Sequence, residues 1–172
     1  MDETLPTFEE VVELIGSTKP PVACRVVELR GDGTERSAKV LFDGVESWFI
    51  EDGARVELRA SRDRVLFDEA GELRRVGPGS AFVYSNAWVK TPIEGYLMNL
   101  EGATGRVTGR DEVDGRQAVI AEFLGLRVGE DIAFLLHVDL ETGIVLRMSR
   151  PDLGEVLRIE GLRVGTVEEL PR

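Results

Sequence analysis

His137 is the only histidine in the chain, and it stands two residues before Asp139. Alternate residues of a strand point to the same face, so we expect the two side chains to lie together, beside Glu141 in a hairpin. An imidazole next to a carboxylate can act as a general acid or base. No serine or cysteine nucleophile accompanies the pair in a recognisable motif, so the sequence favours a structural role for His137.

The acidic residues show no metal-binding pattern. Asp111, Glu112 and Asp114 form an acidic run, but this run lacks the spacing of a calcium loop that ends in a bidentate glutamate. One cysteine, Cys24, and one histidine are too few for a zinc site. An enzyme based on carboxylates would need Glu101, Asp111 and Asp114 to converge in one cleft. We therefore expect no enzymatic activity, no metal and no cofactor.

One helix and a succession of hairpins are the elements that position these groups. Thr7 and Glu10 form a capping box before apolar residues at helical spacing, which predicts a helix over 7–16. Apolar and polar residues then alternate between turn signals such as Asp114-Gly115, as in antiparallel hairpins. Strands are predicted over 22–29, 35–42, 46–51, 55–60, 64–68, 72–76, 104–113, 116–124, 131–138, 144–149 and 155–164, the last with a bulge at Gly161.

The interval 77–102 breaks the strand pattern. It is rich in apolar residues and contains Pro92 and Gly95, which predicts short helical pieces joined by a loop. Long irregular segments are either functional or disordered, and this one is too apolar for disorder. Two interpretations remain open: an ordinary connecting segment with its own core contacts, or a flap that closes over a cavity.

The later strands are apolar on both sides. Residues 116–124 and 131–138 carry apolar side chains at successive positions, not only at alternate ones. Strands of this kind must be covered on both faces, and a short helix over 7–16 covers only part of one face. We therefore expect a sheet that curls, with the flap against its concave face and an apolar pocket between them.

Composition bounds the class of protein. The chain has 172 residues, 42% hydrophobic and 31% charged, which is typical of one soluble globular domain over 1–172. Its net charge of −11 argues against nucleic acid and anionic membranes as partners. The segment after Met1 shows no signal peptide, lipidation cysteine or membrane span, so a cytoplasmic location is expected if Met1 is the native start.

Two motifs resemble those of a known family. Val113–Val119 reads Val-Asp-Gly-Arg-Gln-Ala-Val, and Phe134–Arg147 contains an Asp-x-x-Thr-Gly segment over 139–143 followed by an apolar and basic strand. This succession is similar to that of the bacterial lipoprotein-carrier superfamily. The superfamily includes the periplasmic lipoprotein carriers, the lipid-binding lipoproteins of mycobacteria and the anti-sigma-factor regulators.

The resemblance implies a fold and a kind of ligand. In this family an unclosed half-barrel holds acyl chains or hydrophobic peptides on its concave face, with helices as a plug. Carried over to this chain, the fold is α+β: a curved antiparallel sheet of about 10–11 strands with a short N-terminal helix and a helical plug. Family members are exported, whereas no export signal is seen here, so two alternatives stay open: a lipid-like metabolite as the ligand, or a chain that kept the fold and lost the ligand. The implied lining of the concave face is Trp48, Ile50, Phe82, Trp88, Tyr96 and Phe134.

These observations predict a non-enzymatic binding or carrier module for a hydrophobic, lipid-like or acyl ligand. The segments are a helix over 7–16, a first meander over 22–76, a helical flap over 77–102 and a second meander over 103–165. One alternative is a protein–protein interaction or regulatory module that uses the flap or an edge strand. The other alternative is the carboxylate enzyme described above.

Overall fold

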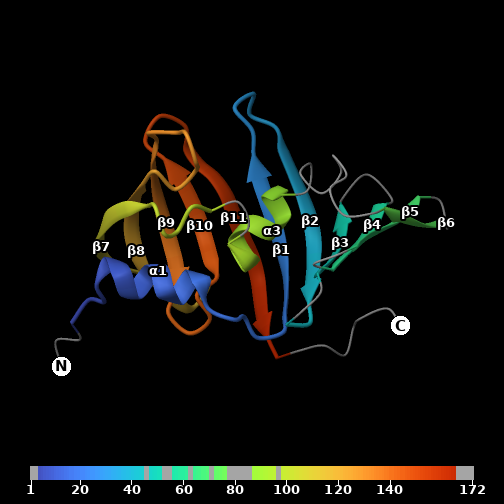
Figure 1. Cartoon of the computed structure of the whole chain (residues 1–172), viewed down its shortest axis with the longest axis horizontal. Helices are drawn as coiled ribbons and strands as arrows, with labels where there is room; N and C mark the ends of the chain where they lie inside the picture. The colour runs from blue at the N-terminus through green and yellow to red at the C-terminus, as the bar shows by residue number, and fades with distance from the viewer. Residues whose placement is uncertain are drawn as a thin grey trace. The chain divides into compact units, whose positions relative to one another are not determined.

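The computed structural model describes residues 4–44, 47–51, 56–61, 64–69, 72–76, 87–95 and 98–165, with side chains described in 4–44, 88, 91–95 and 98–165. The chain forms two compact units (Figure 1). The first unit comprises Met1–Lys19 and Thr91–Arg158, and the second comprises Pro20–Lys90 and Ile159–Arg172. The first unit is therefore interrupted in sequence by most of the second.

Helix α1 (Phe8–Gly16) begins at the predicted capping box. The Thr7 backbone N–H donates to Glu10 Oε2 at 2.7 Å, and the Glu10 N–H donates to Thr7 Oγ1 at 3.2 Å. These reciprocal bonds satisfy N–H groups that a helix start leaves without intrahelical partners. The apolar stripe of the helix is buried, with Val11 at 0% and Ile15 at 2% exposure.

An antiparallel sheet accompanies α1 in the first unit. Its strands are β7 (Thr104–Val113), β8 (Arg116–Leu124), β9 (Ala133–Asp139), β10 (Val145–Arg150) and the first part of β11 (Gly154–Val164). They lie in the order β11-β10-β9-β8-β7, so β7 is an edge strand. The register of β7 against β8 shifts between Val107 and Gly109, which leaves Thr108 as the extra residue of a bulge.

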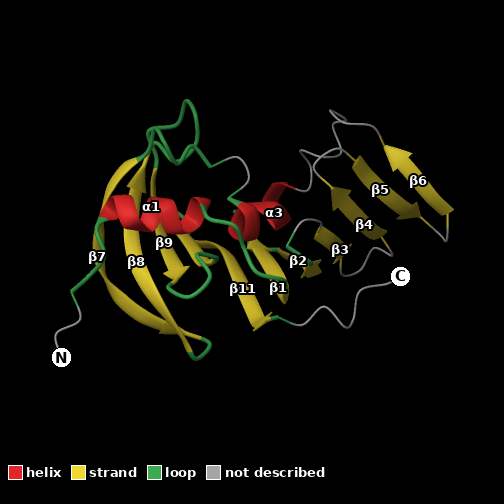
Figure 2. Ribbon diagram, turned by 60° about the horizontal axis from the view of Figure 1, so that its bottom comes forward, coloured by secondary structure: helices red, strands yellow, loops and turns green. Residues whose placement is uncertain are grey.

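Helix α1 lies against one face of this sheet (Figure 2), and buried side chains fill the space between them. The rings of Phe8 in α1 and Phe123 in β8 contact each other, with centroids 4.6 Å apart. Phe123 pairs with Phe134 across β8 and β9, and these two residues are 0% and 1% exposed. Gly105 of β7 makes room for this contact, because a Cβ there would overlap the Phe8 ring.

The opposite face of the first unit is only partly covered. Ala118 is 0% exposed and His137 is 7% exposed, which agrees with the prediction of strands covered on both faces. Leu124 is 46% exposed, so the prediction is wrong at the end of β8. This residue is the last of its strand, where the chain turns into the connection to β9.

The second unit contains the predicted first meander. Its strands are β1 (Val22–Leu29), β2 (Glu35–Phe42), β3 (Ser47–Glu51), β4 (Val56–Ser61), β5 (Arg64–Glu69) and β6 (Glu72–Val76). They lie in the order β6-β5-β4-β3-β2-β1, and β11 follows beside β1. Cys24 is a buried free thiol, and burial raises its pKa to about 12, which makes it an unreactive core residue.

The predicted fold class is confirmed. The chain is α+β, successive strands pair antiparallel within β1–β6 and within β7–β11, and the strand order ends at β6 and β7 without closing. The interval 77–102 contributes α3 (Ala87–Glu94), with Pro92 inside the helix. Residues 77–86 lie outside the described residues, so the flap as a lid stays a prediction, as does a single domain over 1–172. None of the helices in the described ranges is long and apolar enough to cross a membrane.

Candidate functional site

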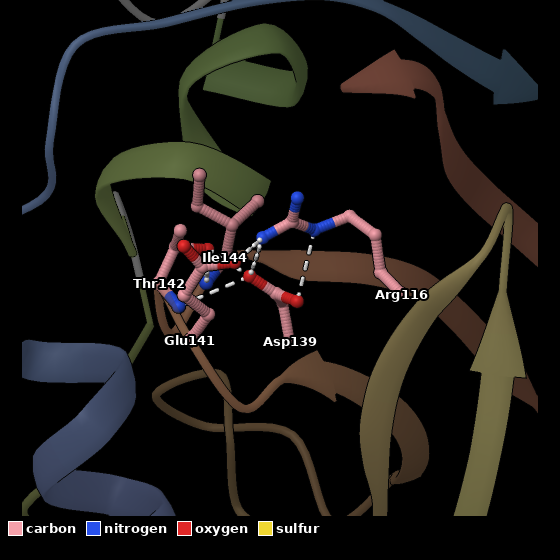
Figure 3. A network of polar contacts seen from close by, with 5 residues as sticks. All are labelled: Arg116, Asp139, Glu141, Thr142 and Ile144. Atoms are coloured by element: carbon pink, nitrogen blue, oxygen red, sulfur yellow. Dashed lines mark hydrogen bonds and ion pairs between the residues drawn. The ribbon is translucent and has the colours of Figure 1, made fainter. Parts of the chain in front are cut away.

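The Asp-x-x-Thr-Gly segment builds a buried polar network in the first unit (Figure 3). Asp139 is 1% exposed and receives four hydrogen bonds. Two come from Arg116, whose Nε and Nη2 donate at 3.0 and 2.9 Å, and two come from the backbone N–H and hydroxyl of Thr142. Arg116 Nη2 also donates to Glu141 at 2.6 Å. Because both carboxylate oxygens are bonded, this buried charge is compensated.

The same segment fastens its hairpin to the end of α1. Gly143 adopts a φ of +69°, and a Cβ at this position would overlap the carbonyl oxygen of Leu14. Lys19, 5% exposed, caps the helix end, since its Nζ donates to the carbonyls of Leu14 at 2.7 Å and Ile15 at 2.8 Å. Burial lowers the pKa of Lys19 to about 8. The motif therefore has a structural role at a close approach between helix and hairpin.

His137 contacts Asp111 of β7 and not Asp139. Its Nδ1 lies 3.1 Å from Asp111 Oδ2, while the Asp139 carboxylate is bonded to Arg116 and Thr142. Arg147 is its direct cross-strand neighbour in β10. Burial is the main cause that holds the pKa of His137 below its usual 6.5, and the positive charge of Arg147 is the second. Asp111 acts in the opposite direction but does not outweigh them. The expected pairing of His137 with Asp139 is wrong, because the turn residues occupy that carboxylate.

The carboxylates proposed for an enzyme do not converge. Glu101 precedes β7, Asp114 lies in the turn after it, and the strand between them has ten residues. A strand of this length spans about 33 Å. Asp114 has a φ of +50° and Gly115 of +77°, as a tight hairpin turn requires. Within the described ranges, no three His, Cys, Asp or Glu side chains group so as to hold a metal ion.

The predicted ligand lining is distributed over both units. Trp88 is 8% exposed in the second unit, where the guanidinium of Arg36 lies 4.2 Å from the centre of its ring. Phe134 is in the core of the first unit. Trp48 and Ile50 belong to β3, whose side chains are not described, and Phe82 and Tyr96 lie outside the described residues. The lining by these residues stays a prediction.

An open apolar hollow of about 320 Å³ lies in the first unit, and sequence reasoning missed it. It is formed by the start of β7, the end of β8 and the start of β9, and an ion pair of 2.7 Å joins Arg106 to Glu122 in its wall. The signal in the sequence was the apolar residue Leu124 next to Phe123, on the opposite face of one strand. The lining residues are Thr104, Gly105, Arg106, Glu122, Leu124 and Ala133.

The sequence matches no protein-family model and no curated protein. Among solved structures, MucB in complex with MucA(peri) is similar at a TM-score of 0.61 and 15% identity, over 96% of this chain and 58% of that chain. The MucA/MucB complex of Pseudomonas aeruginosa is similar at a TM-score of 0.58 and 18% identity, over 92% of this chain and 56% of that chain. This chain thus spans less than two thirds of the length of these two chains.

A LolA-superfamily protein from Nitrosomonas europaea covers 97% of this chain and 96% of its own at 13% identity, but its TM-score of 0.38 is too low to support an argument. At these identities the similarities establish a fold. The expected resemblance is therefore confirmed as a resemblance of fold.

Proposed function

We propose that this chain is a non-catalytic binding module whose ligand is an extended segment of another polypeptide. The open hollow around Leu124 receives an apolar side chain of that segment. The observation that carries the proposal is a large aliphatic side chain, 46% exposed, in the wall of an apolar hollow. Exposed apolar surface next to polar residues is typical of sites where another molecule docks.

The position of the hollow favours a polypeptide. Residues 104–106 of the edge strand β7 form one wall, and an added strand can pair with the backbone of an edge strand while its alternate side chains fill neighbouring pockets. The bulge at Thr108 lies beyond this stretch, so it leaves the start of β7 regular. A volume of about 320 Å³ is at the small end for ligand sites, which suits one or two side chains.

The solved relatives support the same class of ligand. MucB is seen in complex with MucA, which is a protein partner. In this chain the apolar face of β8 and β9 is filled by its own helix, with Val11 and Ile15 at 0% and 2% exposure. The described core of the first unit thus contains protein side chains where an acyl chain would need space.

Site-specific photo-cross-linking in cells tests this proposal. A benzophenone amino acid at Leu124 should yield one cross-linked product of discrete mass, and the same amino acid at Leu153, 54% exposed in the same unit, should not. With the partner purified, Leu124→Asp should weaken binding at least tenfold, as expected for an apolar anchor. Leu153→Asp is the matched control and should bind normally. Equal behaviour of the two positions would contradict the proposal.

A hydrophobic small ligand is the second candidate. It is favoured by Trp88, whose Nε1 is buried and has no hydrogen-bond partner among the described residues. An unpaired buried donor costs about 1–3 kcal/mol, which a ligand oxygen would recover. Native mass spectrometry of protein from cells, with fluorescent fatty acids as probes, measures such binding. A clean apo mass together with no fatty-acid binding excludes this candidate and leaves the first intact.

A further inference from the structure

The edge strand β7 offers a second contact beside the hollow around Leu124, on the opposite face of the sheet. Thr104 pairs with Leu124, which in turn pairs with Ala133, so these three residues of the hollow share one face. Gly105 is the next residue of β7 and therefore belongs to the α1 face. A strand added along residues 104–106 would thus meet the hollow with one side chain and the α1 face with the neighbouring one.

The ring of Phe8 lies over Gly105. Helix α1 begins beside β7 (Figure 2), and a Cβ at Gly105 would lie 2.5 Å from Phe8 Cε2 and 2.9 Å from Phe8 Cζ. The tip of the ring therefore rests on the backbone of the edge strand. Phe8 is partly exposed, whereas its ring partner Phe123 is fully buried. Because glycine has no side chain, no atom of a β7 side chain separates the Phe8 ring from an added strand at this position.

The spacing of a sheet brings an added side chain within reach of this ring. Neighbouring strands lie about 4.8 Å apart, and directly opposed Cβ atoms are about 4.5–5.5 Å apart. A side chain opposite Gly105 would therefore begin about one strand spacing from the Phe8 ring. A large apolar side chain bridges this gap, and an aromatic one reaches the centroid separation of about 4.5–7 Å that ring pairs prefer.

The N-terminal segment of the chain limits this contact to one side chain. Further along β7, Arg110 pairs with Val119 on the α1 face, and its Nη2 donates to the carbonyl oxygen of Thr4 at 3.1 Å. The residues before α1 thus run from Phe8 towards Arg110 on this side of the strand. A partner side chain therefore finds access to the α1 face at Gly105, and the chain itself lies beyond.

We propose that the polypeptide segment bound at the Leu124 hollow carries two consecutive large apolar residues. One enters the hollow, and its neighbour is an aromatic residue that packs on Phe8. This inference rests on the proposed function and adds a sequence requirement for the partner. A strand with one face in solvent alternates apolar and polar residues, so the adjacent apolar pair distinguishes this partner from an ordinary edge strand. Further residues of the segment are polar, because Arg106 and Glu122 border the hollow with an ion pair of their own.

Two synthetic peptides of the same composition test the inference on the full chain. Thr-Lys-Thr-Leu-Phe-Thr-Lys-Thr has adjacent apolar residues, and Thr-Lys-Leu-Thr-Phe-Thr-Lys-Thr places both on one face of an extended strand. Fluorescence anisotropy with a dye on the peptide N-terminus measures both dissociation constants. The adjacent pair should bind at least about tenfold tighter. Leu124→Asp should weaken the binding of the adjacent pair at least about tenfold, as expected for an apolar anchor.

Phe8→Ala should reduce the preference for the adjacent pair to less than about twofold. Leu5→Ala is the matched control, since Leu5 is exposed in the segment before α1, and it should keep the preference. Circular dichroism shows whether each variant is folded. A second measurement needs no variant. Benzophenone in place of the peptide Phe should cross-link to the first turn of α1, and benzophenone in place of the peptide Leu should cross-link around Leu124.

The outcomes separate this inference from the proposed function. Equal binding of the two peptides, or no binding of either, overturns the inference and leaves the proposed function to the photo-cross-linking at Leu124 in cells. The inference is also overturned if both benzophenone positions cross-link to one face of the sheet, or if folded Phe8→Ala keeps the full preference. Normal binding of the adjacent pair by Leu124→Asp contradicts the inference and the proposed function together.

Discussion

Arg116→Met should destabilise the protein by about 3 kcal/mol, because it leaves a buried carboxylate without its cation. The side chain of Asp139 is 2% exposed and that of Arg116 is 19% exposed. Removing one partner of a buried ion pair costs about 3–5 kcal/mol. We expect the lower end of this range, because Arg116 is partly exposed and Thr142 still donates two hydrogen bonds to the carboxylate.

A matched control separates burial from the mere loss of an ion pair. Arg106→Met, in the same unit, breaks the bond to Glu122 at 2.7 Å, and these side chains are 74% and 38% exposed. Exposed pairs contribute less than about 1 kcal/mol. The measurement is urea unfolding followed by far-ultraviolet circular dichroism. Arg116→Met should lower the free energy of unfolding at least about twice as much as Arg106→Met does. A double-mutant cycle with Asp139→Asn should give a coupling of about 1.5 kcal/mol or more.

Tryptophan fluorescence adds a second reading. The two tryptophans, Trp48 and Trp88, both lie in the second unit, whereas Arg116 lies in the first. If residues 1–172 unfold as a single domain, the fluorescence and circular-dichroism midpoints fall together in Arg116→Met. A fluorescence midpoint that stays constant contradicts the single domain. A loss no larger than that of Arg106→Met, or a coupling near zero, refutes the reasoning about the buried carboxylate.

Three further predictions concern the same unit. Gly143→Ala should cost more than about 2 kcal/mol in thermal unfolding, because its φ is +69° and a Cβ would overlap the Leu14 carbonyl, whereas Gly154→Ala, at φ +75° in open space, should cost about 1 kcal/mol. Equal losses would count against the close approach. Burial lowers the pKa of Lys19 from 10.5 to about 8, so its contribution to stability is fully present above pH 10.5 and is lost as the pH falls to 8. Lys19→Met should make the urea midpoint of unfolding less dependent on pH between 8 and 10.5. An unchanged pH dependence in this variant would contradict the prediction. The pKa of His137 lies below 6.5, so stability falls as the pH drops through that folded-state pKa, and His137→Gln removes this loss. An imidazole pKa above 6.5 by NMR titration would contradict this sign.

Features set by neighbouring residues could be predicted from the sequence. The capping box of Thr7 and Glu10 and the hairpin turn at Asp114-Gly115 both form as expected. Each depends on backbone preferences and bonds within a few residues, so its sequence signature is complete. The alternation of apolar residues likewise predicted most strands, since pairing of one strand with the next requires little knowledge of the rest of the chain.

The partner of His137 could not be predicted, because a bulge decides it. Thr108 is an extra residue in β7, and every later residue of the strand is thereby shifted to the other face. Asp111 consequently lies on the face of His137, within 3.1 Å of its Nδ1. Without the bulge the same aspartate would face α1. Nothing in the local sequence of 104–113 marks this single insertion unambiguously, since both registers bury some apolar residues.

The hollow around Leu124 was missed for a different reason. Its sequence signal, successive apolar residues at the end of β8, is also the signal of a strand covered on both faces. Whether the strand end borders an open hollow or is covered depends on where the sheet ends. The edge of the sheet is in turn decided by pairing partners far away in the chain. How far a strand end is buried is therefore decided by tertiary structure, whereas the position of the strand in the chain is decided by the local sequence.

The close approach of Gly143 to the end of α1 has a consequence for synthesis on the ribosome. Helix α1 leaves the exit tunnel well before the hairpin that it packs against, which is made more than a hundred residues later. A nine-residue helix is marginal in water without a packing partner. During that interval Val11 and Ile15 lack their native cover, so the nascent chain presents an unpaired apolar stripe to chaperones. Contacts between such distant segments also slow folding, because a long loop must close before they form.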